Sequence, residues 1–183
     1  QLRKLGYKVG VLDGDITGPS MPRFFGLEKE RTGYAPTDVE DVYKFVPVET
    51  GLGIKTISMN FMIDEEEPLL WKGPVLGNVL MQLFTDTDWG ELDYLLIDMP
   101  PGTGDVAMTI MEQFPVDYLV MVSTPQNMVS MIVQKVVNMA EKLEIPVKGV
   151  IQNLSYIKCN HCGEKMNVFT RNTADSQAEK MGL

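Results

Sequence analysis

The feature that most constrains the fold is a short apolar run that ends in an acid and passes directly into a turn. Residues 95–97 are Leu-Leu-Ile, Asp98 follows, and residues 99–105 are rich in proline and glycine. A run of this length between turn signals is typical of a strand buried on both faces of a parallel sheet. Open α/β sheets bind ligands at the carboxyl ends of their strands, so Asp98 is a candidate for the Mg²⁺ side of a nucleotide-hydrolysing switch. The alternative is a strand that ends in a polar turn.

A second loop of this kind follows the Val-rich run at residues 7–12. Asp13 and Asp15 stand one residue apart there, in a loop interrupted by Gly18 and Pro19. Two acids at the end of a strand can approach Mg²⁺ or a water molecule beside a phosphate. Aspartate also favours turns through hydrogen bonds of its own side chain, so an Asp-rich turn without a ligand is the alternative.

The remaining segments alternate between predicted strands and helices, with a polar surface excursion at residues 28–50 that has room for one hairpin. The alternation, together with the apolar strands, predicts an α/β fold built on a right-handed, doubly wound, mostly parallel sheet with helices on both faces. Strands are expected at 7–12, 53–62, 118–122 and 147–151, helices at 21–26, 75–84, 106–114 and 126–144, an acidic turn at 64–67 and a loop at 71–74.

The third strand end of interest carries an amide. Asn153 follows the predicted strand at 147–151, and its side chain offers both a donor and an acceptor that could read the edge of a base. In a parallel sheet, the loops 13–20, 98–105 and 152–156 fall at the same edge, which predicts one shared crevice. A capping or turn residue is the alternative for Asn153.

Composition narrows the classes of function. The 183 residues suit one domain with a sizeable core, and 44% hydrophobic with 22% charged residues is usual for a soluble protein. The net charge of −9 disfavours nucleic acid or an anionic membrane as a partner. No apolar run reaches the length of about 18 residues that a spanning helix needs, and there is no signal peptide, so we expect a cytoplasmic protein.

Both cysteines, Cys159 and Cys162, lie in one Cys-x-x-Cys within a predicted metal knuckle at residues 156–169. A structural zinc or a four-iron cluster takes four ligands, so two are missing. A second copy of the chain across a two-fold axis would complete a Cys₄ site. Zinc, a cluster and a redox dithiol all remain open from the residues alone, and His161 is expected to point outward.

The two ends of the chain have the pattern of helix ends. Residues 1–6 resemble the last turn of a helix capped by Gly6, and residues 181–183 close another. We therefore expect a single domain over 1–183 that is truncated at its N-terminus before the first acidic loop, and also at its C-terminus.

Five segments together resemble the Mrp/ApbC family of P-loop ATPases, which carry and deliver iron–sulfur clusters and are related to MinD and the nitrogenase iron protein. The resemblance covers nearly the whole chain. The segments, in chain order, are 9–20 (VGVLDGDITGPS), 71–74 (WKGP), 89–94 (WGELDY), 98–105 (DMPPGTGD) and 159–164 (CNHCGE).

The resemblance implies a role for each site residue. Asp13 and Asp15 resemble the first switch, which positions the attacking water and contributes to the Mg²⁺ shell. Asp98 resembles the acid that holds Mg²⁺ through water, and Asn153 resembles the adenine-reading residue. The second switch, which senses the γ-phosphate, corresponds to residues 100–104, including Pro100, Gly102 and Gly104.

The resemblance also implies cofactors and partners. It implies ATP with Mg²⁺, a [4Fe-4S] cluster bridging a homodimer through Cys159 and Cys162, and transfer to apo iron–sulfur proteins in contact with a cluster-assembly scaffold. The chain departs from the family in having no G-x-x-x-x-G-K-[ST] loop, which is expected upstream of Gln1, and in Gly14, where the family more often has alanine. We therefore expect ATP hydrolysis of the longer parent protein rather than of this chain.

Two other functions remain alternatives at this point. One is a non-catalytic scaffold that binds zinc or a cluster and lacks the phosphate loop. The other is a MinD-like positioning ATPase, which gives no role to the cysteine pair.

Overall fold

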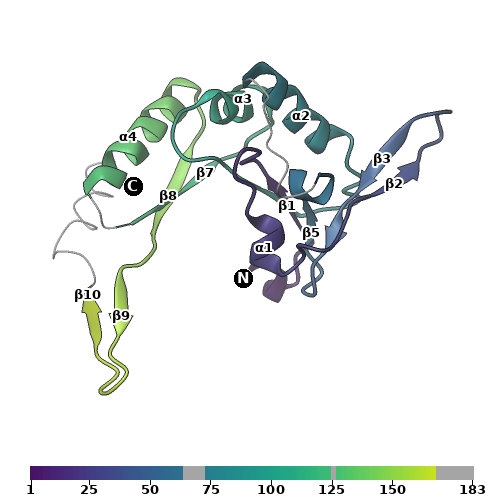
Figure 1. Ribbon diagram of the computed structural model, residues 1–183. Coiled ribbons are helices and arrows are strands. Elements are labelled where there is room, and N and C mark those ends of the chain that lie inside the picture. Colours follow the sequence, from purple (N-terminus) through teal and green to yellow (C-terminus); the bar gives the residue numbers. More distant parts are fainter. Residues whose placement is uncertain (64–72, 125–126, 168–183) are drawn as a thin grey trace. The chain divides into compact units, whose positions relative to one another are not determined.

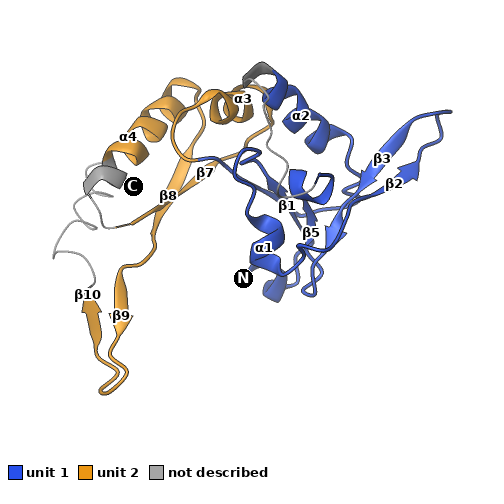
Figure 2. Ribbon diagram, in the orientation of Figure 1, with its two compact units in different colours: residues 1–100 blue, residues 101–183 orange. Residues whose placement is uncertain are grey.

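The computed structural model describes residues 1–63, 73–124 and 127–167 (Figure 1). The chain divides into two compact units, residues 1–100 and 101–183, which are described separately (Figure 2). The predicted turn at 64–67, residues 71–72 of the 71–74 loop and the end of the 156–169 knuckle lie outside the described residues.

Unit 1 is built on a four-stranded sheet in which the central strand is parallel to both neighbours. The order is β4 (Val48–Glu49), β5 (Lys55–Ile57), β1 (Val9–Asp13) and β6 (Tyr94–Asp98), and β4 joins β5 in the antiparallel sense. Every residue of β1 is buried, as its Val-rich sequence predicts. The register sets Asp13 directly opposite Asp98, so the two acidic loops leave the sheet side by side.

The helices of unit 1 complete its core. They are η1 (Leu2–Leu5), α1 (Met21–Phe25), η2 (Met59–Phe61) and α2 (Gly73–Thr85). Leu12 of β1, Ile57 of β5 and Leu80 of α2 are fully buried. The sheet also packs closely at Gly10, where an added Cβ would lie 2.6 Å from Cδ1 of Leu92.

A hairpin of β2 (Gly33–Pro36) and β3 (Tyr43–Val46) extends from unit 1. Both strands lie within residues 28–50, where the sequence predicts a surface excursion with room for one hairpin, and that prediction is confirmed. The base of the hairpin pairs with the chain after α2 through Phe45 and Thr87.

Unit 2 contains α3 (Asp105–Gln113), β7 (Leu119–Ser123), α4 (Asn127–Lys142) and β8 (Val147–Gln152). β7 and β8 are parallel, and they are joined by α4. The apolar stripe of α4 packs on them, in a cluster formed by Met121, Val133, Val136 and Val137 with Val147 and Val150. A second, antiparallel pair, β9 (Tyr156–Lys158) and β10 (Lys165–Asn167), ends the described chain.

The fold class is confirmed as α/β with parallel strands and helices, and most predicted elements agree with the structure to within two residues. Two differ more. The strand predicted at 53–62 ends at Ile57 because Ser58 caps η2. Helix α2 begins at Gly73 instead of Val75, since proline is tolerated in the first turn of a helix.

Parallel strands occur in two separate sheets, one in each unit, and a single domain over 1–183 stays a prediction. Among the described residues, no helix is long and apolar enough to cross a membrane.

Candidate functional site

The acidic site in unit 1 is organised by Asp13, whose side chain is only 1% exposed at the end of β1. Its Oδ2 accepts hydrogen bonds from Ser58 Oγ at 2.9 Å and from the N–H groups of Ser20 and Met21, both at 3.1 Å. Since α1 begins at Met21, this carboxylate holds the start of that helix in place. Its Oδ1 is buried and has no hydrogen-bond partner among the described residues.

Asp98 meets this carboxylate across the sheet. The Gly14 N–H donates to the Asp98 carbonyl at 2.8 Å, which ties the two strand ends together. Burial of part of its side chain raises the pKa of Asp98, and the negative charge of Asp15 raises it further. Burial also raises the pKa of Asp13, against the hydrogen bonds from Met21 and Ser58, and the charge of Asp98 adds to the rise.

Asp15 is the more accessible acid of the first loop. It is half-buried, and its Oδ1 accepts hydrogen bonds from Thr17 Oγ1 at 3.0 Å and from the Gly18 N–H at 3.1 Å. Both bonds belong to a local turn, so they order the loop around the carboxylate. An Asp-rich turn without a ligand, the alternative for this loop, would explain the two hydrogen bonds to Asp15 Oδ1. It would not explain why Asp15 lies close enough to Asp98 to raise the pKa of Asp98.

The structure thus brings together Asp13, Asp15 and Asp98, the three acids that the sequence places at one sheet edge. Oδ1 of Asp13 is a buried acceptor without a donor, and the pKa values of Asp13 and Asp98 are raised. A bound water molecule would supply the missing donor, and a bound cation would lower both pKa values. In the described part of the chain, no three His, Cys, Asp or Glu side chains form a set that could hold a metal ion. A Mg²⁺ ion here would therefore take most of its ligands from water and nucleotide, as Mg²⁺ commonly does.

The loop after β6 passes from one unit to the other. Pro100 closes unit 1, and Gly102 and Gly104 open unit 2. Gly102 has φ +85°, a conformation that suits glycine, and Gly104 caps α3 with an extended backbone. Their role at a γ-phosphate stays a prediction.

Asn153 lies at the end of β8 in unit 2. Its N–H donates to the Ser123 carbonyl at 2.7 Å, which joins the carboxyl ends of β7 and β8. Its side-chain Oδ1 accepts from the Leu154 N–H at 2.9 Å, as in a turn, while the residue remains exposed. Among the described residues, the side-chain Nδ2 of Asn153 donates no hydrogen bond, and base recognition stays a prediction.

Cys159 and Cys162 lie at the turn of the β9–β10 hairpin, and both thiols are free. The Cys159 N–H donates to the Glu164 carbonyl at 2.8 Å, and the Gly163 N–H donates to the Cys159 carbonyl at 2.9 Å. Gly163 makes the reversal possible with φ +73°. Hydrogen bonds from the backbone of Cys162 and then of His161 lower the pKa of the Cys159 thiol. The turn is therefore already arranged to present a thiolate, and the His161 side chain is exposed.

One residue of the acidic site was not predicted. Ser58 is fully buried between β5 and η2, 45 positions along the chain from the Asp13 carboxylate to which it donates. Asn60 assists it by donating from Nδ2 to the Pro19 carbonyl at 3.4 Å. The sequence feature that could have indicated this role is the polar pair Ser58 and Asn60 inside an otherwise apolar segment.

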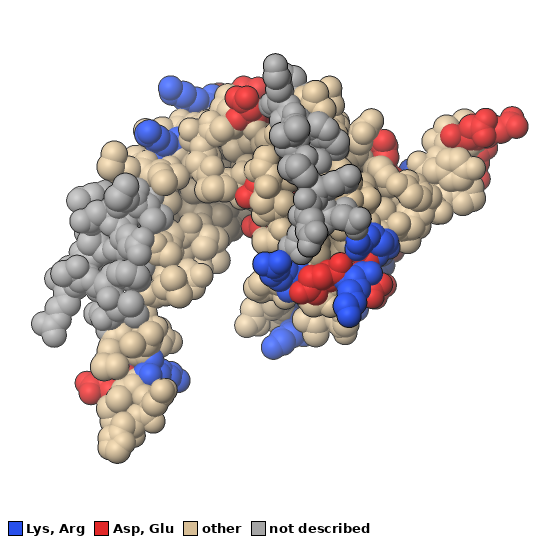
Figure 3. Space-filling model, viewed as in Figure 1, with Lys and Arg blue, Asp and Glu red and all other residues tan. Residues whose placement is uncertain are grey.

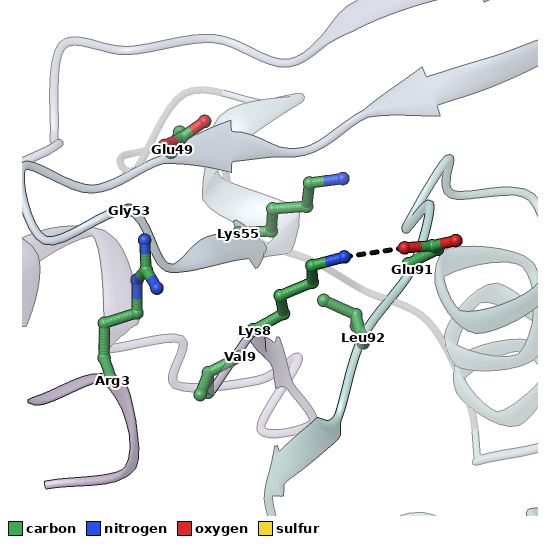
Figure 4. A pocket seen from close by; sticks show the side chains of 8 residues that line it. All are labelled: Arg3, Lys8, Val9, Glu49, Gly53, Lys55, Glu91 and Leu92. Atoms are coloured by element: carbon green, nitrogen blue, oxygen red, sulfur yellow. Dashed lines mark hydrogen bonds and ion pairs between the residues drawn. The ribbon is translucent and has the colours of Figure 1, made fainter. Parts of the chain in front are cut away.

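A separate hollow of about 350 Å³ lies at the amino ends of β1 and β5 (Figure 4). Its cations already have partners within unit 1. Lys8 pairs with Glu91 at 2.6 Å, and Lys55 Nζ donates to the Trp89 carbonyl at 2.6 Å. None of the predicted site residues lines it, and we assign it no ligand.

The α/β fold with acids at the carboxyl ends of parallel strands is one that nucleotide-binding proteins share. A solved structure of a nucleotide-binding protein from Archaeoglobus fulgidus in complex with ADP matches the chain with a TM-score of 0.80 and 38% sequence identity. The match covers 99% of this chain and 68% of that one.

Residues 1–183 match the ParA family model described as the NUBPL iron-transfer P-loop NTPase, and the chain belongs to this family. The resemblance inferred from the sequence motifs is therefore confirmed.

Several curated relatives support this assignment. An iron-sulfur cluster carrier protein of Clostridium perfringens is 57% identical over the whole chain and 65% of its own length. A protein of the same name from Pyrococcus horikoshii is 37% identical, with 63% of its length covered. The iron-sulfur cluster transfer protein NUBPL of Dictyostelium discoideum is 39% identical over 96% of this chain and 53% of its own. The chain thus spans between half and two thirds of these relatives.

Proposed function

We propose that the full-length protein to which this chain belongs is an iron–sulfur cluster carrier, with the cluster as its cargo. The observation that carries the proposal is the pair of free thiols, Cys159 and Cys162, presented by the β9–β10 turn. The backbone hydrogen bonds around Cys159 favour the thiolate form, which is the form that binds iron. The names of the relatives support the same cargo.

We infer that the cluster is a [4Fe-4S] cluster bridging two copies of the chain. Such a cluster takes four thiolates, and each copy supplies two. Ile157 and Met166 face each other across the hairpin and are 53% and 45% exposed, so they offer apolar surface beside the thiols. A two-fold axis at the turn would bury this surface and complete the Cys₄ set.

We infer that Mg²⁺ and ATP bind at the acidic edge of the sheet. Three donors already occupy Oδ2 of Asp13, so only its Oδ1 remains for a cation or water. Asp15 is more accessible and better suited to direct an attacking water, while Asp98 suits water-mediated contact with Mg²⁺. The phosphate-binding loop would come from a segment outside this chain, and Asn153 and residues 100–104 would contact the base and the γ-phosphate.

The proposed cellular role follows from these two sites. ATP binding and hydrolysis would change the shape of the dimer through the switch loops, and the cluster would pass to apo iron–sulfur proteins in the cytoplasm after loading from an assembly scaffold. The second candidate is a zinc-binding scaffold, which the same turn geometry favours because Cys-x-x-Cys-Gly also forms half of a zinc ribbon.

Anaerobic reconstitution of the full-length protein with iron and sulfide tests the proposal. We expect a brown dimer that absorbs near ~400 nm and that is lost in the Cys159→Ala variant. A colourless dimer that retains zinc under these conditions would favour the scaffold. Binding of Mg²⁺-ATP to the full-length protein and to its Asp98→Ala variant tests the nucleotide site independently of the cluster.

A further inference from the structure

The β2–β3 hairpin carries an exposed aromatic face that neither of the proposed sites uses. Alternation along the strands places Tyr34, Pro36, Tyr43 and Phe45 on one face, with Tyr34 opposite Phe45 and Pro36 opposite Tyr43. Tyr34 is 63% exposed and Tyr43 is 57% exposed. Aromatic rings that are this open on a protruding hairpin are typical of contact surfaces.

The hairpin is held firmly at its base. The Phe45 N–H donates to the Asp86 carbonyl at 2.7 Å, and the Asp88 N–H donates back to Phe45 at 2.8 Å. Thr32 Oγ1 adds a bond to the Val46 carbonyl at 2.7 Å, and the Tyr34 and Phe45 ring centroids lie 5.6 Å apart. The aromatic face is thus presented on an ordered support, which lowers the entropic cost of binding.

The tip of the hairpin is acidic and also ordered. Asp38, Glu40 and Asp41 are exposed, and none of the three forms an ion pair with another described residue. The Thr37 N–H donates to the Val42 carbonyl at 2.9 Å and closes the loop. Figure 3 shows these carboxylates gathered at the end of the arm.

We propose that this hairpin is a docking arm for an extended, Lys- or Arg-rich segment of a partner protein. Basic side chains would stack on the open rings of Tyr34 and Tyr43 and pair with the carboxylates of the tip. A second copy of the chain does not fit, because acidic tips repel each other and each chain carries a net charge of −9. The same negative charge disfavours nucleic acids and anionic membranes as partners of the arm.

Binding of a labelled synthetic nonapeptide of alternating arginine and leucine to the full-length protein tests the proposal by fluorescence anisotropy. We expect Tyr34→Ser with Tyr43→Ser to weaken binding about tenfold, and Tyr34→Phe with Tyr43→Phe to keep it. We expect Glu40→Gln with Asp41→Asn to weaken it about threefold and to reduce its salt dependence. Lys44→Ser, on the opposite face of β3, is the matched control and should leave binding unchanged or stronger.

Several results would overturn the docking arm. They are an absence of binding at about 1 mM peptide, equal binding by the Ser variants, and equal binding of a peptide with glutamate in place of arginine. The Glu40→Gln and Asp41→Asn variant keeps the backbone of the tip intact, because asparagine tolerates the φ of +60° at position 41. Unchanged binding by this variant would therefore overturn the docking arm even if loss of both tyrosines disturbs the hairpin.

Discussion

The hydroxyl of Ser58 donates to Oδ2 of Asp13 at 2.9 Å, and both side chains are buried at the carboxyl edge of the unit 1 sheet. The same oxygen accepts the first N–H groups of α1, so a single carboxylate joins β1, α1 and the β5–η2 turn. A residue expected to act mainly on a nucleotide thus also organises the loop that precedes α1.

Removing this hydroxyl should destabilise the fold. We expect Ser58→Ala to lower the free energy of unfolding by about 1–3 kcal/mol, because the buried Asp13 carboxylate loses one of the three donors to its Oδ2. Urea denaturation of the chain measures the change. Ser20→Ala is the matched control, since Ser20 donates through its backbone N–H and should lose little. Equal losses in the two variants would contradict the role of Ser58.

The acidic edge should also make stability depend on pH in an unusual direction. Folding raises the pKa of Asp13 and of Asp98 above 3.8. Between about pH 4 and the raised values, the folded state therefore holds more protons than the unfolded state, and these two groups contribute less stability as the pH rises. We expect Asp98→Asn to remove part of this slope and to raise the Tm at pH 7 by about 2 °C, a small change because the side chain keeps part of its surface in water.

Thermal unfolding in EDTA from pH 4 to pH 7 checks this prediction. Asp117→Asn, an exposed acid outside the cluster, is the control. A lower Tm for Asp98→Asn than for the parent chain at pH 7 would show that the carboxylate at this position stabilises the fold.

The ends of the strands could be predicted from the sequence, but the side-chain hydrogen bonds that support them could not. Apolar runs are typical of buried parallel strands, so β1 and β6 were identifiable, and their common direction brought Asp13 and Asp98 to one edge. The burial predicted for residues 95–97 on both faces is wrong, because no residue of β6 is fully buried and Leu96 is 45% exposed. The partner of Asp13 was not identifiable, because a hydrogen bond between residues 45 positions apart depends on how β5 aligns with β1. The early end of β5 has the same origin, since the buried Ser58 begins η2 instead of extending the strand.

Close packing against β1 gives another test. An added Cβ at Gly10 would lie 2.6 Å from Leu92 and 2.9 Å from Leu95, whereas one at Gly149 in β8 would meet nothing within 4 Å. We therefore expect Gly10→Ala to destabilise the chain by about 1–3 kcal/mol through overpacking. Gly149→Ala should be neutral or slightly stabilising in the same urea titration. A neutral Gly10→Ala would mean that both leucines move aside at no cost.

The cysteine turn should depend on the backbone of Gly163. Its φ of +73° is costly for alanine by about 1–2 kcal/mol, while asparagine adopts it more readily. We expect Gly163→Ala to weaken Co²⁺ binding by the full-length protein about tenfold, followed through the thiolate-to-metal absorption, and Gly163→Asn to restore most of it. Identical affinities for the alanine and asparagine variants would argue against a preformed turn.

The measurement that tests the carrier most directly is native mass spectrometry of the anaerobically reconstituted full-length protein, followed by incubation with an apo iron–sulfur protein. We expect two chains with one [4Fe-4S] cluster, no cluster in either Cys159→Ala or Cys162→Ala, and movement of the cluster to the acceptor. A cluster held within one chain, or a zinc-bridged dimer that passes nothing on, would contradict it.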